Sequence, residues 1–208
     1  MAYFPMYVDI ENQRCLVAGG GEIALRKVRV LKDFGASVTV VAPQILPEIR
    51  DMQVHSIERE FSEEDLENCM VVVAATDDKE ENHRIAELAK KKHICVNAVD
   101  AKEDCTFLFP AYVKKQNLVG AFSSGGNSPV ITQYLKQNMQ EVLTDELGIV
   151  NEYMGSIRDT VKQRTATEKL RKKIYKAVLE TLLEEGKQTL SEERLAAIIE
   201  KETKESDG

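Results

Sequence analysis

Three consecutive glycines near the start of the chain have the spacing that holds a pyrophosphate. They follow a short apolar segment at residues 14–18, precede a helical pattern, and form Gly-x-Gly-x-x-Ala with Ala24. At a strand-to-helix turn Gly19 permits a tight turn, Gly21 lets the backbone approach a pyrophosphate, and the alanine lets the helix pack closely. Elsewhere the same string is an ordinary glycine-rich turn, and the two flanks favour a dinucleotide site. The residues expected to hold it are Gly19, Gly20, Gly21, Glu22, Ile23 and Ala24, with the N–H groups of Glu22 and Ile23 facing the anion.

Asp100 is the residue best placed to move a proton. It follows the apolar run at residues 94–97, which has the pattern of a buried strand. A partly buried carboxylate at the end of such a strand can take a proton while a nicotinamide takes a hydride. Position alone fits a turn or helix-capping aspartate equally well.

A second candidate anion site lies at residues 123–128. Hydroxyl groups, two glycines and the start of a helix are combined there, and Ser128 is a good N-cap. Such a loop can hold a carboxylate or phosphate, although a flexible turn before a capped helix has the same composition. The candidate substrate-binding residues are Ser123, Ser124, Gly125, Gly126 and Ser128.

Alternating strands and helices must position these groups. Short β-branched or apolar runs predict strands, and amphipathic stretches between them predict helices. The predicted strands are residues 14–18, 37–41, 54–59, 70–75, 94–97 and 106–109; the predicted helices are residues 22–34, a short one capped near Ser62, and one capped by Asp77 and Asp78 that runs to about Lys92.

Parallel strands joined by helices form a doubly wound α/β sheet, which binds ligands at the carboxyl ends of its strands. The loops at residues 19–24, 42–44, 76–78 and 97–100 should therefore open onto one crevice. No acid or arginine follows the second strand, where a ribose-binding carboxylate is common, so Gln44 or backbone groups would serve. The residues thus leave NAD and NADP open. The further candidate cofactor contacts are Pro43, Gln44, Thr76, Asp77 and Asn97.

After Pro110 the pattern changes. Two short strands at residues 111–114 and 118–122 precede a helix at residues 130–143, and charged helices follow Gly148. In that last part, residues 165–168 have the pattern of a capping box, Gly186 ends one helix, Ser191 starts the next, and the tail from Lys201 is expected to fray.

Composition excludes several classes of protein. The chain has 208 residues and a formal charge of −7, which argues against general affinity for nucleic acid or anionic membranes. No apolar run approaches the roughly 20 residues of a membrane span, and the start lacks the pattern of a signal peptide, so a cytoplasmic protein is expected. Its four cysteines and three histidines show no metal-ligand spacing, so we expect no metal site.

The chain resembles the precorrin-2 dehydrogenase and sirohydrochlorin ferrochelatase family, the N-terminal module of siroheme synthase. The resemblance covers residues 4–143 in order, and its Ser-Gly-Gly-x-Ser-Pro string is distinctive. The matching strings are Phe4-Pro5-Met6-Tyr7, residues 15–24 with Arg26-Lys27, residues 40–43, Ala74-Ala75-Thr76-Asp77-Asp78, Asn97-Ala98-Val99-Asp100, Phe107-Leu108-Phe109-Pro110-Ala111 and residues 122–129.

The resemblance implies an NAD-dependent oxidation of precorrin-2 to sirohydrochlorin, with Asp100 as the key acid–base residue. It implies a Rossmann-type domain at residues 1–111, a small α+β dimerisation segment at residues 112–147 that makes a homodimer, and a C-terminal helical domain at residues 148–208. Because no methyltransferase domain follows in this sequence, we expect the free-standing form.

Two alternatives stay open. The same carboxylate could also serve iron insertion, which would make the protein a bifunctional dehydrogenase and ferrochelatase. A non-catalytic nucleotide-sensing module is a different class of protein, but it has no use for Asp100 or the loop at residues 123–128.

Overall fold

The computed structural model describes residues 3–207. The chain divides into two compact units, Met1–Phe109 and Pro110–Gly208. Each unit has a hydrophobic core of its own, and each is described by itself below.

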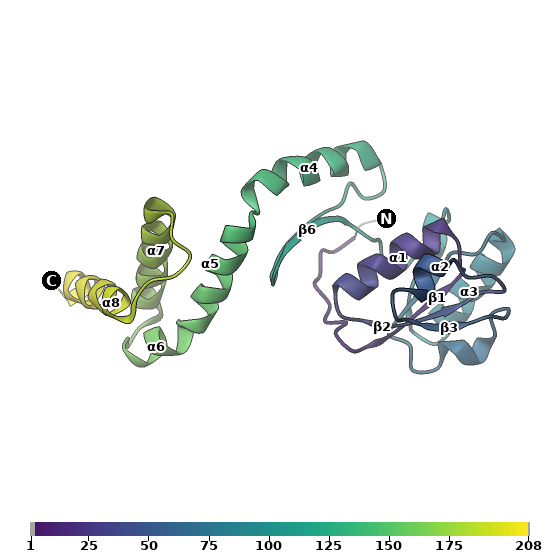
Figure 1. The fold of residues 1–208 in the computed structure, drawn as a ribbon, viewed down its shortest axis with the longest axis horizontal. Helices are drawn as coiled ribbons and strands as arrows, with labels where there is room; N and C mark the ends of the chain where they lie inside the picture. The colour runs from purple at the N-terminus through teal and green to yellow at the C-terminus, as the bar shows by residue number, and fades with distance from the viewer. Residues whose placement is uncertain (1–2, 208) are drawn as a thin grey trace. The chain divides into compact units, whose positions relative to one another are not determined.

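The first unit is built on a parallel five-stranded sheet in the order β3-β2-β1-β4-β5. Strands β1, β2 and β3 are labelled in Figure 1. This is the strand order of the Rossmann fold, and the direction of winding reverses between β1 and β4. In register, Val17 of β1 lies between Val40 of β2 and Val73 of β4. The strands are β1 (Arg14–Ala18), β2 (Ser37–Val41), β3 (His55–Ile57), β4 (Val71–Ala74) and β5 (Cys95–Ala98).

Both faces of this sheet are buried, which explains why its strands are continuous apolar runs. In β1, Cys15 and Val17 belong to the cluster that includes α1 (Glu22–Asp33), whereas Leu16 and Ala18 belong to the cluster that includes α3 (Lys79–Lys91). All four residues are fully buried. The doubly wound sheet predicted from the sequence is therefore confirmed.

Short helical segments complete the first unit. They are α2 (Pro47–Arg50) and the 3-10 turns η1 (Glu63–Leu66) and η2 (Lys102–Asp104). The predicted cap at Ser62 is confirmed, because Ser62 and Asp65 form a capping box at the start of η1. Asp65 also accepts two hydrogen bonds from the Arg59 guanidinium, at 2.8 and 2.6 Å.

The strand predicted at residues 106–109 is wrong. Thr106 donates one backbone hydrogen bond to Val96 of β5, at 2.8 Å, and no strand forms in this segment. The rings of Phe107 and Phe109 instead pack with the α1 cluster, with centroids 5.1 Å apart. Aromatic residues in a short run favour burial as much as strand pairing, and here burial decides the path. The third strand is also shorter than its predicted range of residues 54–59.

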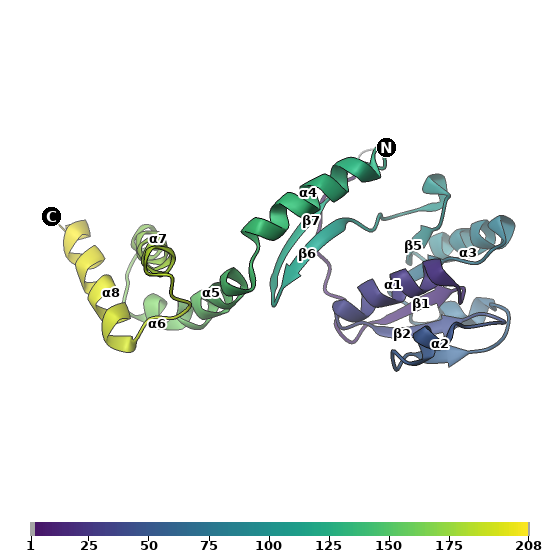
Figure 2. The same cartoon turned by 45° about the horizontal axis from the view of Figure 1, so that its top comes forward.

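The second unit begins with an antiparallel hairpin of β6 (Ala111–Lys115) and β7 (Leu118–Phe122). The helix α4 (Pro129–Val142) lies along this hairpin (Figure 2). Four further helices follow, and Ile174, Val178 and Leu182 form the centre of their core. They are α5 (Asp145–Ser156), α6 (Arg158–Gln163), α7 (Glu168–Glu185) and α8 (Glu192–Asp207).

The ends of these helices confirm some predictions and correct others. Gly186 ends α7 with a left-handed φ of 61°, and Ser191 accepts from the N–H of Arg194 at the start of α8. The predicted capping box at residues 165–168 is wrong. Thr167 is the N-cap, and the buried Thr165 donates its hydroxyl proton back to Val161 at 2.7 Å.

The other two corrections concern helix length. Helix α5 begins at Asp145, ahead of Gly148. The tail does not fray at Lys201, because α8 continues to Asp207. The pair Lys204–Glu200 bridges one helical turn of this segment at 2.6 Å, and such i,i+4 pairs stabilise a helix.

Candidate functional site

The carboxyl edge of the sheet brings three loops into contact around Gly19 and Gly20. Gly19 has a φ of 128° and donates to the carbonyl oxygen of Val41 at 2.9 Å. A Cβ at Gly19 would overlap the carbonyl oxygen of Ala75 after β4, and one at Gly20 would overlap that of Gln44 after β2. Both glycines are therefore needed for the close packing of these loops.

Gly21 differs from its two neighbours because it faces open space. A Cβ at Gly21 would have nothing within 4 Å. Gly21 is the N-cap of α1 and supplies no side-chain hydrogen bond, so the first N–H groups of the helix, at Glu22 and Ile23, are left to a ligand. The positive end of the helix dipole adds to their attraction for an anion. This cradle fits a pyrophosphate.

The residues beside the cradle have the expected sizes. Ala24 is fully buried against β1 and allows the helix to pack closely. Glu22 and Ile23 are exposed at the first turn of α1, and Pro43 and Gln44 are exposed after β2. The structure thus brings these residues to one edge of the sheet.

The loop after β4 is held by a residue that the sequence analysis misses. The side-chain oxygen of Asn82 accepts from the N–H and the hydroxyl of Thr76, at 2.9 and 2.8 Å. Its amide donates to the Thr76 carbonyl at 3.0 Å. Asp78 caps α3 by accepting from the N–H of Glu80, whereas Asp77 is exposed. No signal in the sequence distinguishes Asn82 from the other polar residues of this helix, because its role depends on the contact with Thr76.

Asn97 has a structural role that the sequence does not predict. It is buried at the end of β5, and its side-chain amide donates to the Phe107 carbonyl at 3.1 Å and to the Cys105 sulfur at 3.4 Å. Both amide protons are therefore used to hold the following segment. The expected contact between Asn97 and the cofactor stays a prediction. The hydrogen bonds that Asn97 makes do not favour it.

Asp100 lies in the turn after β5, at the same edge as the glycines. The N–H of Val99 donates to Ala74 at 2.9 Å, which fixes the turn beside the end of β4. Since β5, β4 and β1 are neighbours, about 10 Å separates this position from the glycine turn. Asp100 has a φ of 60° and an exposed side chain, so the partial burial expected for it is not found in this chain.

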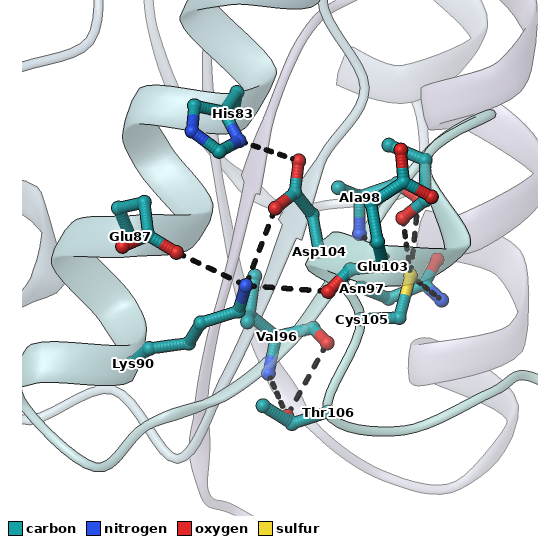
Figure 3. Close-up of polar contacts among 11 residues, drawn as sticks. His83, Glu87, Lys90, Val96, Asn97, Ala98, Glu103, Asp104, Cys105 and Thr106 are labelled. Carbon is teal, nitrogen blue, oxygen red and sulfur yellow. Dashed lines mark hydrogen bonds and ion pairs between the residues drawn. The ribbon is translucent and has the colours of Figure 1, made fainter. Parts of the chain in front are cut away.

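A buried carboxylate four residues after Asp100 makes two ionic contacts with α3. Asp104 is 5% exposed and lies 2.8 Å from Nδ1 of His83 and 3.2 Å from Nζ of Lys90 (Figure 3). Burial on its own raises the pKa of Asp104, but the hydrogen bonds from His83 and Lys90 outweigh it and lower the pKa below its usual range. The hydrogen bond to Asp104 also raises the pKa of His83.

Lys27, in the second turn of α1, lies against the ring of Phe109. Its Nζ lies 4.1 Å from the centre of the Phe109 ring. Burial, followed by the nearby charge of Arg26, lowers the pKa of Lys27.

The loop at residues 123–128 belongs to the second unit. The hydroxyl oxygen of Ser124 accepts from the N–H of Ser128 at 2.9 Å, and that of Ser128 accepts from the N–H of Ile131 at 3.3 Å, which confirms Ser128 as the N-cap of α4. Ser123 accepts from the N–H of Gly125 at 3.1 Å. A hydroxyl that accepts in this way keeps its proton for donation to a ligand.

Two absences concern only the part of the chain that the structure describes. Within residues 3–207, no group of three or more His, Cys, Asp or Glu side chains is arranged to hold a metal ion. None of the described helices is both long and apolar enough to cross a membrane.

The strand order, its reversal between β1 and β4 and the glycine cradle at the start of α1 together define a Rossmann-type dinucleotide-binding protein. Residues 6–111 match the model of a family described as "Putative NAD(P)-binding". The chain belongs to this family, and its cofactor is a nicotinamide dinucleotide.

Several siroheme synthases are similar over nearly the whole chain. A siroheme synthase of Nitrosospira multiformis is 38% identical over 99% of this chain and 46% of its own length. A siroheme synthase of Methylobacillus flagellatus is 35% identical over 95% of this chain and 43% of its own length. The chain therefore spans less than half the length of these relatives.

A solved structure described as SirC, precorrin-2 dehydrogenase, has the same fold. It superposes with a TM-score of 0.69 over 97% of this chain and 100% of its own, at 22% sequence identity. The architecture of both units thus occurs in a known protein.

Proposed function

We propose that this chain is a precorrin-2 dehydrogenase that oxidises precorrin-2 to sirohydrochlorin, with NAD as the hydride acceptor, in the cytoplasm. The observation that carries the proposal is the placement of Asp100 and the glycine cradle at one edge of the sheet, two strands apart. The names of the similar siroheme synthases and of SirC support the choice of substrate.

The chain's own residues bind the cofactor, orient the reacting groups and move a proton. The N–H groups at the start of α1 hold the pyrophosphate, and Thr76, fixed by Asn82, lines the crevice beside it. When bound, NAD supplies the acceptor for the hydride that the oxidation removes. The carboxylate of Asp100 takes the proton that leaves with it, so the substrate loses one hydride and one proton and gains a double bond.

The choice of NAD over NADP is part of the proposal. No arginine stands at the end of β2 to pair with a ribose phosphate, and Gln44 is exposed at that position. A neutral amide can hydrogen-bond a ribose hydroxyl and offers no charge to a phosphate.

The substrate is rich in carboxylates, which fits the hydroxyl-lined loop at residues 123–128. Ser123, Ser124 and Ser128 each accept a backbone hydrogen bond and keep a proton to donate. We propose that this loop holds substrate carboxylates.

We further propose a homodimer formed through the segment that contains α4. No residue of α4 is buried, and its apolar side chains Val130, Ile131, Tyr134 and Val142 are all more than half exposed, from 55% to 76%. An apolar face of this kind marks an interaction surface, and a second copy of the chain would cover it. Val130→Glu combined with Tyr134→Glu should convert a dimer to a monomer in sedimentation analysis, and a monomeric wild type would contradict the proposal.

Incubation of the purified protein with precorrin-2 and NAD tests the function. We expect sirohydrochlorin and NADH to accumulate together in equal amounts. The absorbance of each product measures its formation. NAD binding without turnover would instead indicate a nucleotide-sensing module. Sirohydrochlorin and Fe(II) without NAD form the second arm, in which metal insertion would show the bifunctional enzyme.

A further inference from the structure

The segment that follows Asp100 is fixed by three consecutive side chains. Asp104 is bound to His83 and Lys90 of α3, as described above. Thr106 accepts from the N–H of Val96 in β5 through its hydroxyl, at 2.8 Å. The residue between these two anchors, Cys105, is therefore held in one position relative to the sheet (Figure 3).

Cys105 contacts both ends of the turn that carries Asp100. Its sulfur lies 3.2 Å from the carbonyl oxygen of Ala98 and 3.3 Å from that of Ala101, and the single thiol proton is shared between these two acceptors. The N–H of Ala98 also donates to the sulfur at 3.3 Å. The Cys105 side chain thus connects Ala98, two residues before Asp100, to Ala101, the residue after it.

The turn needs such support because of its backbone. Asp100 has a φ of 60°, a left-handed conformation that is uncommon for residues other than glycine. Conformations of this kind persist where the surrounding structure holds them in place. Since the Asp100 side chain is exposed, no packing of its own fixes the carboxylate.

We infer that Cys105 is a positioning residue for Asp100: its thiol holds the turn at residues 98–101 so that the carboxylate faces the reaction site. The inference rests on the proposed function for its catalytic part. Burial raises the pKa of the Cys105 thiol, so the sulfur keeps its proton at neutral pH and remains a hydrogen-bond donor.

Three variants and one matched control test this role. Cys105→Ala removes the hydrogen bonds, Cys105→Val removes them while filling the space, and Cys105→Ser keeps a donor and an acceptor. Cys69→Ala is the control, because Cys69 is a buried cysteine of the first unit that, like the partly buried Cys105, donates to a backbone carbonyl, that of Asp65, at 3.2 Å. It precedes β4 and so lies at the opposite edge of the sheet.

The first measurement needs no activity. Amide hydrogen exchange of the peptide containing residues 97–104 should become faster in Cys105→Ala and Cys105→Val, return toward the wild-type rate in Cys105→Ser, and stay unchanged in Cys69→Ala. Unchanged exchange in both Cys105→Ala and Cys105→Val would overturn the inference. If Cys105→Ala does not fold, the valine variant decides.

The second measurement is turnover with precorrin-2 and NAD. Misplacement of a catalytic group costs up to about hundredfold in rate, so kcat should fall by about tenfold to hundredfold in Cys105→Ala, with little change in the Kd for NAD, and recover in Cys105→Ser. Faster exchange with an unchanged kcat would refute the positioning role. A wild type that binds NAD but does not turn over refutes the proposed function instead, and the exchange data then decide by themselves whether Cys105 holds the turn.

Discussion

Asn82 and Thr76 are joined by three hydrogen bonds. The side-chain oxygen of Asn82 accepts two of them, and its amide nitrogen donates the third. Asn82 is buried in the first turns of α3, and Thr76 is the second residue after β4. Helix α3 therefore fixes the loop that follows β4 at the carboxyl edge of the sheet.

Replacement of Asn82 by alanine should loosen this loop. The free energy of unfolding should fall by about 1–3 kcal/mol, because the N–H and carbonyl of Thr76 lose their partners. NAD should also bind more weakly, as measured by calorimetry. Asp78→Ala is the matched control, since it removes the cap of the same helix, at a cost of about 1 kcal/mol, and leaves the Asn82–Thr76 contacts in place. Equal NAD affinity in the two variants would contradict this role.

Gly21→Val should abolish NAD binding and leave the fold intact. The new side chain would enter the open space before α1, where nothing lies within 4 Å of a Cβ, and would occupy the pyrophosphate position. We expect affinity for NAD to fall more than about tenfold at an unchanged Tm. Gly20→Val should behave differently and unfold the first unit, because its Cβ would overlap the carbonyl of Gln44. Normal NAD affinity in Gly21→Val would exclude this turn as the phosphate site.

Asp100→Asn should lower kcat and leave NAD bound. Asparagine also tolerates a positive φ, so the backbone conformation at 60° is kept while the proton acceptor is lost. We expect kcat to fall by about 10²–10⁴-fold, the usual contribution of a general base. Stopped-flow measurement of NADH formation provides the test, and retention of wild-type turnover would remove Asp100 from its proposed role.

The ion pair of His83 and Asp104 should make stability depend on pH. The pKa of His83 is raised, so its contribution is complete below the unfolded value of about 6.5 and is lost as pH rises through the folded value. The pKa of Asp104 is lowered, so its contribution is present above about 3.9 and is lost as pH falls through the folded value.

The Tm difference between wild type and Asp104→Asn should therefore be larger near about pH 5.5 than near about pH 8.5. It should not vanish at the higher pH, because Lys90 stays paired with Asp104. An NMR titration of His83 provides a direct check: its pKa should exceed about 6.5 in the wild type and decrease in Asp104→Asn. A difference in Tm that is independent of pH would contradict the assignment.

The sheet was predictable because its burial on both faces leaves a simple pattern. Runs such as residues 37–41 and 71–74 are β-branched and bounded by turn residues, and the glycine turn marks where the first helix starts. The C-cap at Gly186 and the N-cap at Ser128 were predictable for the same reason, since both depend on local chemistry.

The supports of the site were not predictable, because they depend on contacts between distant segments. Asn82 is an ordinary polar residue of an amphipathic helix until Thr76 is folded against it. The role of Cys105 depends on the path of residues 105–107, which run back alongside β5. The same return removes the strand expected at residues 106–109. Thr165 shows a local competition, in which a bond back to Val161 replaces the expected cap.

The close approach of Gly19 to Ala75 and of Gly20 to Gln44 means that the cradle depends on three strands at once. No part of the sheet that lacks one of these three strands contains the complete cradle, so cofactor binding would stabilise the first unit against unfolding. Saturation at a hundred times Kd would add about 2.7 kcal/mol to the stability of that unit. In a cell, the supply of nicotinamide dinucleotide would thereby help to set how much of the protein escapes proteolysis.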